Sequence, residues 1–213
     1  MMRKIGAVAG VIFTGLSLWG CGGSDIDNKA QAAASSNTVM EVLKDGSIVE
    51  TITEDFTADY YNEDDLRSMI LSEVAEYNRD SEKDISVDKF ENKDGIITVA
   101  IKYPSAEAYT DYNSSQFDSR RLFVGTVKEA YDEGHSLDVT LTSADNDEES
   151  IGKEDLLGMG ENHILISEVP FRVETFGKIL YFDDNVVSLG KNEAAMQTDE
   201  NGESLGKYYI VFK

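Results

Sequence analysis

The chain has few of the residues that cross-link small folds or build catalytic sites. Its single cysteine, Cys21, can form no disulfide within the chain, so the fold must be stabilised by an apolar core. Its two histidines, His135 and His163, belong to no cluster that could supply the three or four ligands of a zinc site. No Gly-x-Ser-x-Gly sequence, phosphate loop or dinucleotide fingerprint appears. We therefore predict no enzymatic activity, no metal site and no cofactor.

Basic residues are also scarce, because 19 Lys and Arg stand against 41 Asp and Glu, a formal net charge of −22. Such an acidic chain is unsuited to nucleic acid, whose phosphates require a basic surface. It also repels anionic lipid headgroups. Cationic partners or divalent metals would suit the charge, but solubility is the simpler explanation for it.

No hydrophobic run is long enough to cross a membrane as a permanent helix. The uncharged run from Ile5 to Leu18 has 14 residues, short of the roughly 20 that a bilayer requires. With Arg3 and Lys4 before it, the run is typical of the hydrophobic region of a secretion signal, which we place at residues 1–20. An uncleaved N-terminal anchor helix is the alternative.

The end of this segment resembles the lipobox of bacterial lipoprotein signal peptides. Leu18 stands three positions before the cysteine, Gly20 is the small residue directly before it, and Cys21 is the modified position. Trp19 is bulkier than this pattern usually has. The resemblance implies that the Cys21 thiol takes a diacylglycerol and that cleavage follows Gly20.

The resemblance also implies a domain organisation. Two or more acyl chains hold a protein stably on a bilayer, so the lipid on Cys21 would anchor the chain to the membrane without spanning it. Residues 21–37, rich in Gly, Ser, Ala and Asn, are predicted to be a flexible tether. Residues 38–213 are then one extracytoplasmic domain. Loss of Arg3 and Lys4 with the signal leaves 17 basic side chains against 41 acidic ones, a net charge of −24.

Two β-hairpins are predicted from a repeated Lys-Asp-Gly sequence, at residues 39–53 and 85–103. In the first, a two-residue loop would place Glu41 opposite Glu50, and directly opposed like charges are unfavourable. A three-residue loop with the glycine in the left-handed conformation avoids this opposition, and we prefer it in both hairpins. It pairs Val42 with Ile48 and Glu41 with Val49 in the first hairpin, and Val87 with Ile101 and Ile85 with Tyr103 in the second.

Two helices are also predicted. The first begins at Asn62, a good N-cap, and runs to about Tyr77. Its apolar stripe is Leu66, Met69, Ile70, Val74 and Tyr77. The second covers about 119–133 and ends at Gly134. Its inward-facing residues are expected to be Leu122, Phe123, Val127, Ala130 and Tyr131.

The C-terminal half is predicted to be rich in strands. Residues 136–142 alternate like a strand, residues 143–150 form an acidic loop, and residues 151–159 suit one or two helical turns. The last strand is strongly apolar, so we place it inside a sheet. Because strands dominate and neither helix links parallel strands, the fold class is α+β with a mostly antiparallel sheet. The six later strands are expected at 163–168, 171–176, 178–182, 186–189, 193–197 and 207–212.

Three groups of side chains are candidate sites. The acidic loop resembles a calcium loop, but Ser150 and Leu156 replace the glycine and glutamate that an EF-hand needs, so a solvated loop is preferred. The tyrosine pair at 60–61 and the aromatics of residues 109–123 could line a groove, although aromatics beside helices are more often core residues. Asp183-Asp184-Asn185 fits a turn better than a site. The acids of the loop are Asp145, Asp147, Glu148 and Glu149. The aromatics before the second helix are Tyr109, Tyr112 and Phe117, and they are expected to form a short turn.

Short sequences spread over residues 39–213 carry a second resemblance. They are Glu54-Asp55-Phe56, Tyr60-Tyr61, Asp65-Leu66, Leu122-Phe123-x-Gly125-Thr126-Val127, Glu129-Ala130, Gly177-Lys178-Ile179-x-Tyr181 and Tyr209-Ile210-Val211-Phe212-Lys213. In these the chain is similar to small lipoproteins of clostridial gut bacteria. That resemblance implies no activity. It does imply a Gram-positive host, and hence the outer face of the cytoplasmic membrane.

These features predict a membrane-anchored extracytoplasmic lipoprotein that binds an envelope protein or peptide and is not an enzyme. The main alternative is a small-molecule-binding or ion-binding lipoprotein, which would need an enclosed pocket. A further alternative is a hydrolase of wall or glycan, which would need acids with perturbed pKa values converging in a cleft.

Overall fold

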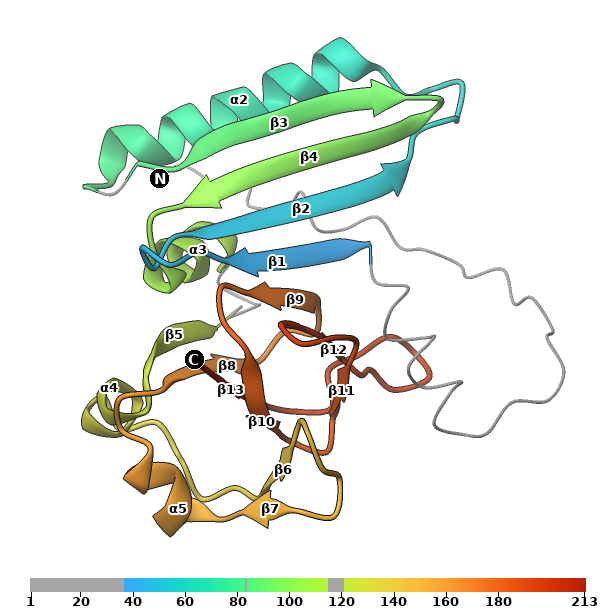
Figure 1. Cartoon of the computed structure of the whole chain (residues 1–213). Helices are drawn as coiled ribbons and strands as arrows, with labels where there is room; N and C mark the ends of the chain where they lie inside the picture. Colours follow the sequence, from blue (N-terminus) through green and yellow to red (C-terminus); the bar gives the residue numbers. More distant parts are fainter. Residues whose placement is uncertain (1–36, 83, 115–120) are drawn as a thin grey trace, which may run out of the picture.

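The computed structural model describes residues 37–82, 84–114 and 121–213, so Leu18, Gly20 and Cys21 lie outside the described residues. The described chain forms two β-sheets with helices packed against them, and the α+β class with mostly antiparallel strands is confirmed. One sheet has seven strands and the other has six. In the upper part of Figure 1, helix α2 (Glu63–Asp80) lies beside the first strands of the seven-stranded sheet, and helices α4 (Val127–Asp132) and α5 (Lys153–Gly158) lie in the lower part with the six-stranded sheet.

The seven-stranded sheet has the order β11-β12-β9-β1-β2-β4-β3. Neighbouring strands are antiparallel except β1 and β9, which run parallel. A residue and its partner on the next strand share one face of a sheet. The strands are β1 (Thr38–Val42), β2 (Ile48–Asp55), β3 (Ser86–Lys93), β4 (Ile96–Tyr103), β9 (Arg172–Thr175), β11 (Val186–Ser188) and β12 (Glu193–Met196).

The first hairpin has the predicted three-residue loop. Val42 lies opposite Ile48, and Glu41 lies opposite Val49. Gly46 has a φ of 83°, and its N–H donates to the Leu43 carbonyl at 3.0 Å. The left-handed conformation after this turn is accessible to glycine at little cost, which explains the glycine of the Lys-Asp-Gly sequence.

The predicted loop of the second hairpin is wrong. Asp94 (φ 54°) and Gly95 (φ 79°) form a two-residue loop, with Lys93 opposite Ile96. Positive φ at both central residues is typical of a type I′ turn, whose twist matches that of the strands. This register places Phe90 opposite Val99, an aromatic–β-branched pair.

A bulge in β3, between Val87 and Lys89, then shifts the register by one residue. Val87 therefore lies opposite Ile101, as predicted, although the turn differs. The bulge also brings Val87 and Phe90 to the same face of the sheet, even though they are three residues apart.

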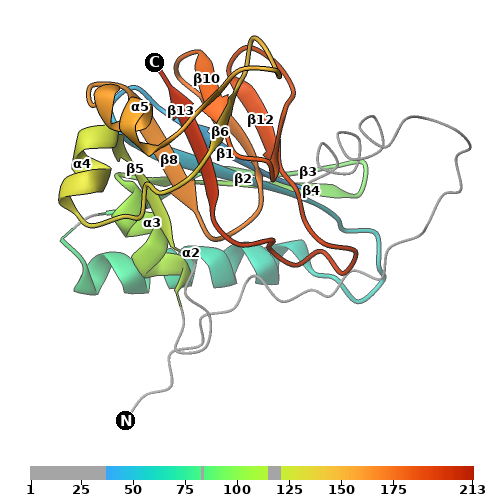
Figure 2. The same ribbon diagram turned by 90° about the horizontal axis from the view of Figure 1, so that it is seen from below.

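Helix α2 confirms the first predicted helix and extends it to Asp80. The Asn62 side chain accepts a hydrogen bond from the Asp65 N–H at 3.1 Å, so Asn62 is the N-cap. Ile70 and Val74 are buried, but Met69 is 43% exposed because it lies at the edge of the apolar stripe. Figure 2 shows α2 lying along one side of strands β1 to β4.

The second predicted helix is wrong in its first half, where residues 121–126 are described. Leu122–Thr126 form strand β5, and α4 begins at Val127. The Thr126 side chain accepts from the Glu129 N–H at 3.1 Å, and the Glu129 carboxylate accepts from the Thr126 N–H at 2.7 Å. This capping box starts a helix at Val127 and not earlier. The predicted end is confirmed at Gly134 (φ 83°), whereas Tyr131, expected to face inward, is 56% exposed.

Two further expectations need correction. Tyr109 and Tyr112, expected in a short turn, belong to helix α3 (Ala106–Asn113), and Phe117 lies outside the described residues. The strand expected at 136–142 begins only at Leu141, because Leu137 is buried without a partner strand. The helical turns expected at 151–159 are present as α5, and all six later strands are confirmed.

The six-stranded sheet has the order β5-β8-β13-β10-β6-β7. The predicted position of the last strand inside a sheet is confirmed, because β13 lies between β8 and β10. Besides β5, the strands of the six-stranded sheet are β6 (Leu141–Ser143), β7 (Ser150–Ile151), β8 (His163–Ser167), β10 (Ile179–Phe182) and β13 (Tyr208–Phe212).

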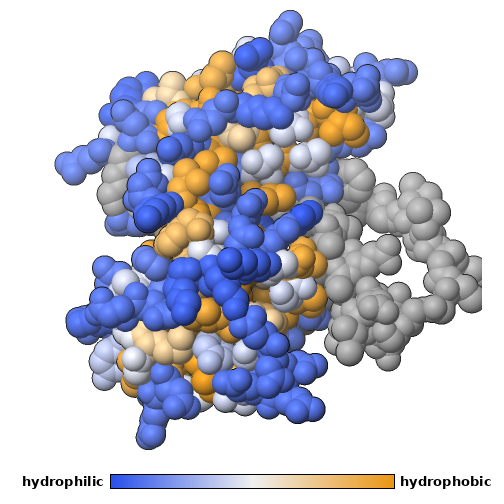
Figure 3. All heavy atoms as spheres, viewed as in Figure 1, coloured by the Kyte–Doolittle hydropathy of each residue, from blue (hydrophilic) through white to orange (hydrophobic). Residues whose placement is uncertain are grey.

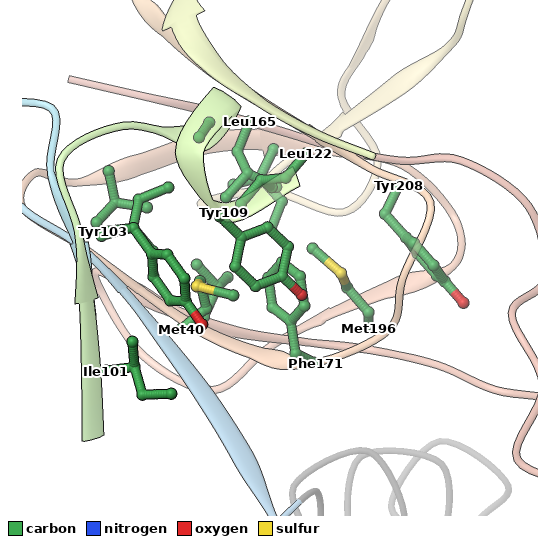
Figure 4. Close-up of a cluster of buried hydrophobic side chains, with 14 of the residues drawn as sticks. Met40, Ile101, Tyr103, Tyr109, Leu122, Leu165, Phe171, Met196 and Tyr208 are labelled. Carbon is green, nitrogen blue, oxygen red and sulfur yellow. The ribbon is translucent and has the colours of Figure 1, made fainter. Parts of the chain in front are cut away.

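Two clusters of buried side chains form the core. The larger joins the two sheets and includes Met40 and Tyr103 from one sheet and Leu165 and Tyr208 from the other (Figure 4). The smaller lies on the far face of the six-stranded sheet, beneath α4 and α5. Its buried members are Val127, Ala130, Leu137, Leu141, Leu156, Ile164, Ile166, Tyr209 and Val211.

Candidate functional site

An exposed group of aromatic rings lies where β2 leads into α2. Phe56 and Tyr61 stack with ring centroids 4.7 Å apart and planes 14° apart, and Tyr60 meets Tyr61 edge-on at 4.7 Å. Tyr60 is 82% exposed and Tyr61 is 36% exposed. We call Phe56, Tyr60 and Tyr61 the aromatic platform. Large aromatic side chains usually bury their rings, so a ring pair this open is a candidate binding surface.

Local hydrogen bonds hold the platform in place. Phe56 donates its N–H to the Gly95 carbonyl at 2.7 Å, which ties the platform to the turn of the second hairpin. Thr57 donates both its N–H (3.0 Å) and its hydroxyl (2.6 Å) to one carboxylate oxygen of Asp55. The Tyr61 N–H donates to the Ala58 carbonyl at 3.0 Å. These bonds fix the backbone under the rings, so the platform is preorganised for contact.

The surroundings of the platform are acidic. Six carboxylates and no basic residue lie between residues 54 and 65, and within the described chain none of the six forms an ion pair. Those with side-chain partners have neutral ones, such as Asn37 beside Glu54 and Asn92 beside Glu63. The six are Glu54, Asp55, Asp59, Glu63, Asp64 and Asp65.

The neighbouring carboxylates affect the pKa of a platform tyrosine. The pKa of the Tyr61 phenol is raised, first by its hydrogen bond with Tyr60 and by the charge of Tyr60, and further by the charges of Asp55 and Glu54. The hydrogen bond from Tyr60 is the main cause, and the two carboxylates add to it because nearby negative charge disfavours a phenolate. A cation placed over these rings would be favoured for the same electrostatic reason.

A second cluster of tyrosines is buried and contrasts with the platform. Tyr103, fully buried, donates its hydroxyl to the Glu50 carboxylate at 2.9 Å, and Asn113 donates to the Tyr103 oxygen at 3.3 Å. Burial, with the charges of Glu73 and Glu50, raises the pKa of Tyr112 to about 12. Ring centroids 5.3 to 5.9 Å apart link Tyr103 to Tyr109 and Tyr112. Tyr103 and Tyr109 belong to the main core, and Tyr112 is partly buried against it, so this cluster stabilises the fold.

A shallow groove separates α2 from the edge strand β3. Its volume is about 150 Å³, and Arg67, Leu71, Val87 and Phe90 are among its lining residues. Arg67 lies over the Phe90 ring at 5.1 Å and so already has a partner. Pockets for drug-sized molecules hold about 300–1,000 Å³, so this groove suits only a few atoms.

The acidic loop is tied into the fold as the connection between β6 and β7. The Asp145 carboxylate pairs with Lys178 at 2.5 Å. The Ser143 N–H donates to the Glu149 carbonyl at 2.8 Å, and the Glu148 N–H donates to the Asn146 side chain at 3.1 Å. A carboxylate already paired with a lysine is poorly placed to bind calcium.

Both histidines pack against aromatic rings. His135 lies 4.5 Å from the Phe123 ring, and its backbone N–H donates to the Ala130 carbonyl at 2.9 Å. His163 stacks on Phe212 at 5.5 Å and meets Phe176 edge-on at 4.9 Å. These contacts account for both side chains as parts of the packing.

The interpretation of Asp183-Asp184-Asn185 as a turn is confirmed. Asp183 is buried, and its carboxylate accepts hydrogen bonds from the N–H of Asn185 at 2.7 Å and from the N–H of Tyr209 in β13. Burial raises the pKa of Asp183, although the two backbone hydrogen bonds act in the opposite direction. Asp183 therefore closes a turn and completes the hydrogen bonding of a central strand.

The two groups of aromatics proposed from the sequence thus differ in their exposure to solvent. Tyr60 and Tyr61 are exposed on the platform, whereas Tyr109 is buried and Tyr112 packs against the core. The sequence did not indicate that Phe56 belongs with the tyrosine pair. Its spacing of five residues from Tyr61 fits no regular element, and the stacking depends on the loop conformation.

None of the described helices is long and apolar enough to cross a membrane. Among the described residues, no three His, Cys, Asp or Glu side chains converge in a way that could hold a metal ion. No family model, no curated protein and no solved structure matches the chain.

Proposed function

We propose that this chain is a lipid-anchored extracytoplasmic binding module, without catalytic activity of its own, that contacts an envelope protein or peptide through the aromatic platform. The observation that carries the proposal is the exposure of the platform, with Tyr60 at 82%. Rings held open on a hydrogen-bonded loop are available for contact without rearrangement.

The position of the platform fits a membrane-anchored module. The described chain begins at Asn37, whose side chain donates to Glu54 at 3.4 Å and whose carbonyl accepts from Thr53. The chain therefore enters the domain at the platform end of the sheet, where β1 starts and β2 ends (Figure 1). With a lipid on Cys21, residues 21–37 could reach at most about 60 Å. The partner would then lie within about that distance of the bilayer.

The surface favours a localised contact over a broad apolar interface. On the face seen in Figure 3, hydrophobic residues form separate patches among hydrophilic ones. Obligate interfaces are larger and more continuously apolar. A small aromatic site within an acidic surface suits a protein or peptide segment that is recognised locally.

The contact can be tested by photocrosslinking in cells of the native host. A photoreactive phenylalanine analogue replaces Tyr60 in one full-length variant and Tyr131 in another. Tyr131 is the matched control, because it is a tyrosine that is 56% exposed on α4. We expect a discrete crosslinked species from position 60 only. Equal labelling from both positions, or none from position 60, would contradict the proposal.

The anchor has a separate test. Native mass spectrometry of the full chain, extracted in mild detergent from its host, should show a mass that begins at a diacylated Cys21. Cys21→Ser should move the protein from the membrane fraction to the soluble fraction. An unmodified chain that begins at Met1 would overturn the lipid anchor but leave the platform experiment valid.

A further inference from the structure

We propose, on the basis of this function, that the aromatic platform recognises a cationic peptide segment, with Lys or Arg side chains over the rings of Tyr60 and Tyr61 and against the neighbouring carboxylates. The occupant is identified by charge complementarity. The segment 54–65 that carries the platform has six carboxylates and no basic residue, and the charges of Asp55 and Glu54 act on the Tyr61 ring.

The geometry provides both parts of a cation site. The face of an aromatic ring attracts an ammonium or guanidinium group within about 6 Å of its centroid. The edge-on contact between Tyr60 and Tyr61, with planes at 64°, makes a corner of two rings in place of a flat stack. A long basic side chain can lie in such a corner with its charged end near a carboxylate.

Three of the carboxylates near the platform, Glu54, Asp59 and Asp64, are available to such a partner. The Asp59 and Asp64 side chains form no hydrogen bond or ion pair with other described residues and are exposed. Glu54 has only a long hydrogen bond, 3.4 Å, from Asn37. Some acids elsewhere pair with the chain's own bases, as in Lys128–Asp132 on α4. Among the residues that the structure describes, the acids at the platform form no such ion pair.

Two other occupants fit less well. A neutral glycan could stack on the tyrosines but would gain nothing from the charge. An anionic membrane surface would be repelled by it, because each like charge near the bilayer is unfavourable. The cationic peptide is the occupant for which the rings and the acids act together.

The experiment uses the full chain in nonionic detergent and fluorescein-labelled hexalysine and hexaarginine peptides, titrated by fluorescence anisotropy near physiological salt. We expect the double variant Tyr60→Ala/Tyr61→Ala to weaken binding about tenfold. Tyr60→Phe/Tyr61→Phe keeps the ring faces and should stay within about twofold of the wild type. Circular dichroism melting confirms that each variant is folded.

A net charge of −22 attracts any polycation, so a matched charge control is essential. The platform variant Glu54→Gln/Asp59→Asn/Asp64→Asn removes three charges near the rings. The control Asp147→Asn/Glu148→Gln/Glu149→Gln removes three charges from the acidic loop. We expect about a tenfold loss for the platform variant and less than about a twofold loss for the control.

Three outcomes would overturn the inference. Equal losses in the two charge variants would mean unspecific attraction, and unchanged binding after removal of the two rings would mean that the platform is not the site. Tighter binding of tetra-N-acetylglucosamine or of a short-chain, water-soluble phosphatidylglycerol than of hexalysine would identify another occupant. Each of these can occur while crosslinking from position 60 succeeds in cells. Failure of the cationic partner is therefore distinguishable from failure of the proposed function.

Discussion

The two sheets of this protein differ in how many of their faces are buried. In β13 of the six-stranded sheet, Ile210 packs into the main core and Val211 packs into the second cluster beneath α4 and α5, so both faces are covered. In β1 of the seven-stranded sheet, Met40 is fully buried, but Glu41 on the opposite face is exposed. Strands buried on both faces have continuous apolar sequences, whereas strands buried on one face alternate.

This difference separates stability from recognition. The six-stranded sheet has apolar contacts on both sides and should contribute most of the free energy of unfolding. The seven-stranded sheet leaves its outer face, and the platform at one end, in contact with solvent. Substitutions there should be tolerated by the fold, so the surface of this sheet is available for binding.

The largest expected effect comes from truncating an isoleucine in each sheet. Ile210→Ala removes a fully buried side chain from β13 and should lower the free energy of unfolding by about 4 kcal/mol. Ile52→Ala, in β2, removes a partly buried side chain and should cost about 1 kcal/mol. Chemical denaturation of both variants measures the difference. Similar losses would mean that the two sheets contribute equally.

A sharper comparison changes polarity without creating a large cavity. Val211→Thr places a hydroxyl in the second cluster, away from water, and should lower the free energy of unfolding by about 2 kcal/mol. Val49→Thr, on the outer face of β2 where Val49 is only partly buried, should change it by less than about 0.5 kcal/mol. A large loss at Val49 in denaturation curves would show that the outer face is buried in solution.

The strands could be predicted from the sequence where burial gives a clear pattern. The apolar run of β13 indicated an internal strand, and the opposition of Glu41 and Glu50 was sufficient to choose the loop of the first hairpin. In the second hairpin no opposed like charges distinguish the two possible loops. The observed two-residue loop pairs Phe90 with Val99. A bulge that later restores the register leaves no recognisable signal in a single sequence.

The remaining differences between the predicted and the observed structure come from tertiary contacts. Leu122 and Val127 fit helical spacing, but Leu122 belongs to a strand because β8 offers it a partner. The parallel pairing of β1 with β9 joins residues more than 130 positions apart, and no local pattern indicates it. The tyrosine pair was recognised as a candidate site, but only its packing distinguishes it from the buried Tyr109.

A substitution of Asp183 measures how a buried polar side chain contributes to the stability of the six-stranded sheet, which is covered on both faces. Asp183→Asn keeps one acceptor oxygen but turns an N–H toward a backbone donor, and should lower the free energy of unfolding by about 1.5 kcal/mol at neutral pH. Burial raises the folded-state pKa of Asp183 above its ordinary value of 3.8. Stability from this group is therefore fully present below 3.8 and is lost as pH rises through the folded pKa. The Asn variant lacks this increment, so its deficit should grow as pH is lowered from 7 toward 4, and a deficit that shrinks would contradict the assignment.

The smallest effect concerns the open face of the seven-stranded sheet. Glu174 lies directly opposite Glu41 on β1 and Glu193 on β12, so three carboxylates lie side by side across three strands. Arg172 compensates Glu193, but opposed like charges still lower stability. Glu174→Lys should therefore raise the free energy of unfolding by about 0.5 kcal/mol at low salt. Because this face is in contact with solvent, the gain should nearly vanish at 1 M salt, where the screening length is about 3 Å. A gain that persists in high salt would mean that these side chains are shielded from water, and the contrast between the two sheets would then be smaller than their burial indicates.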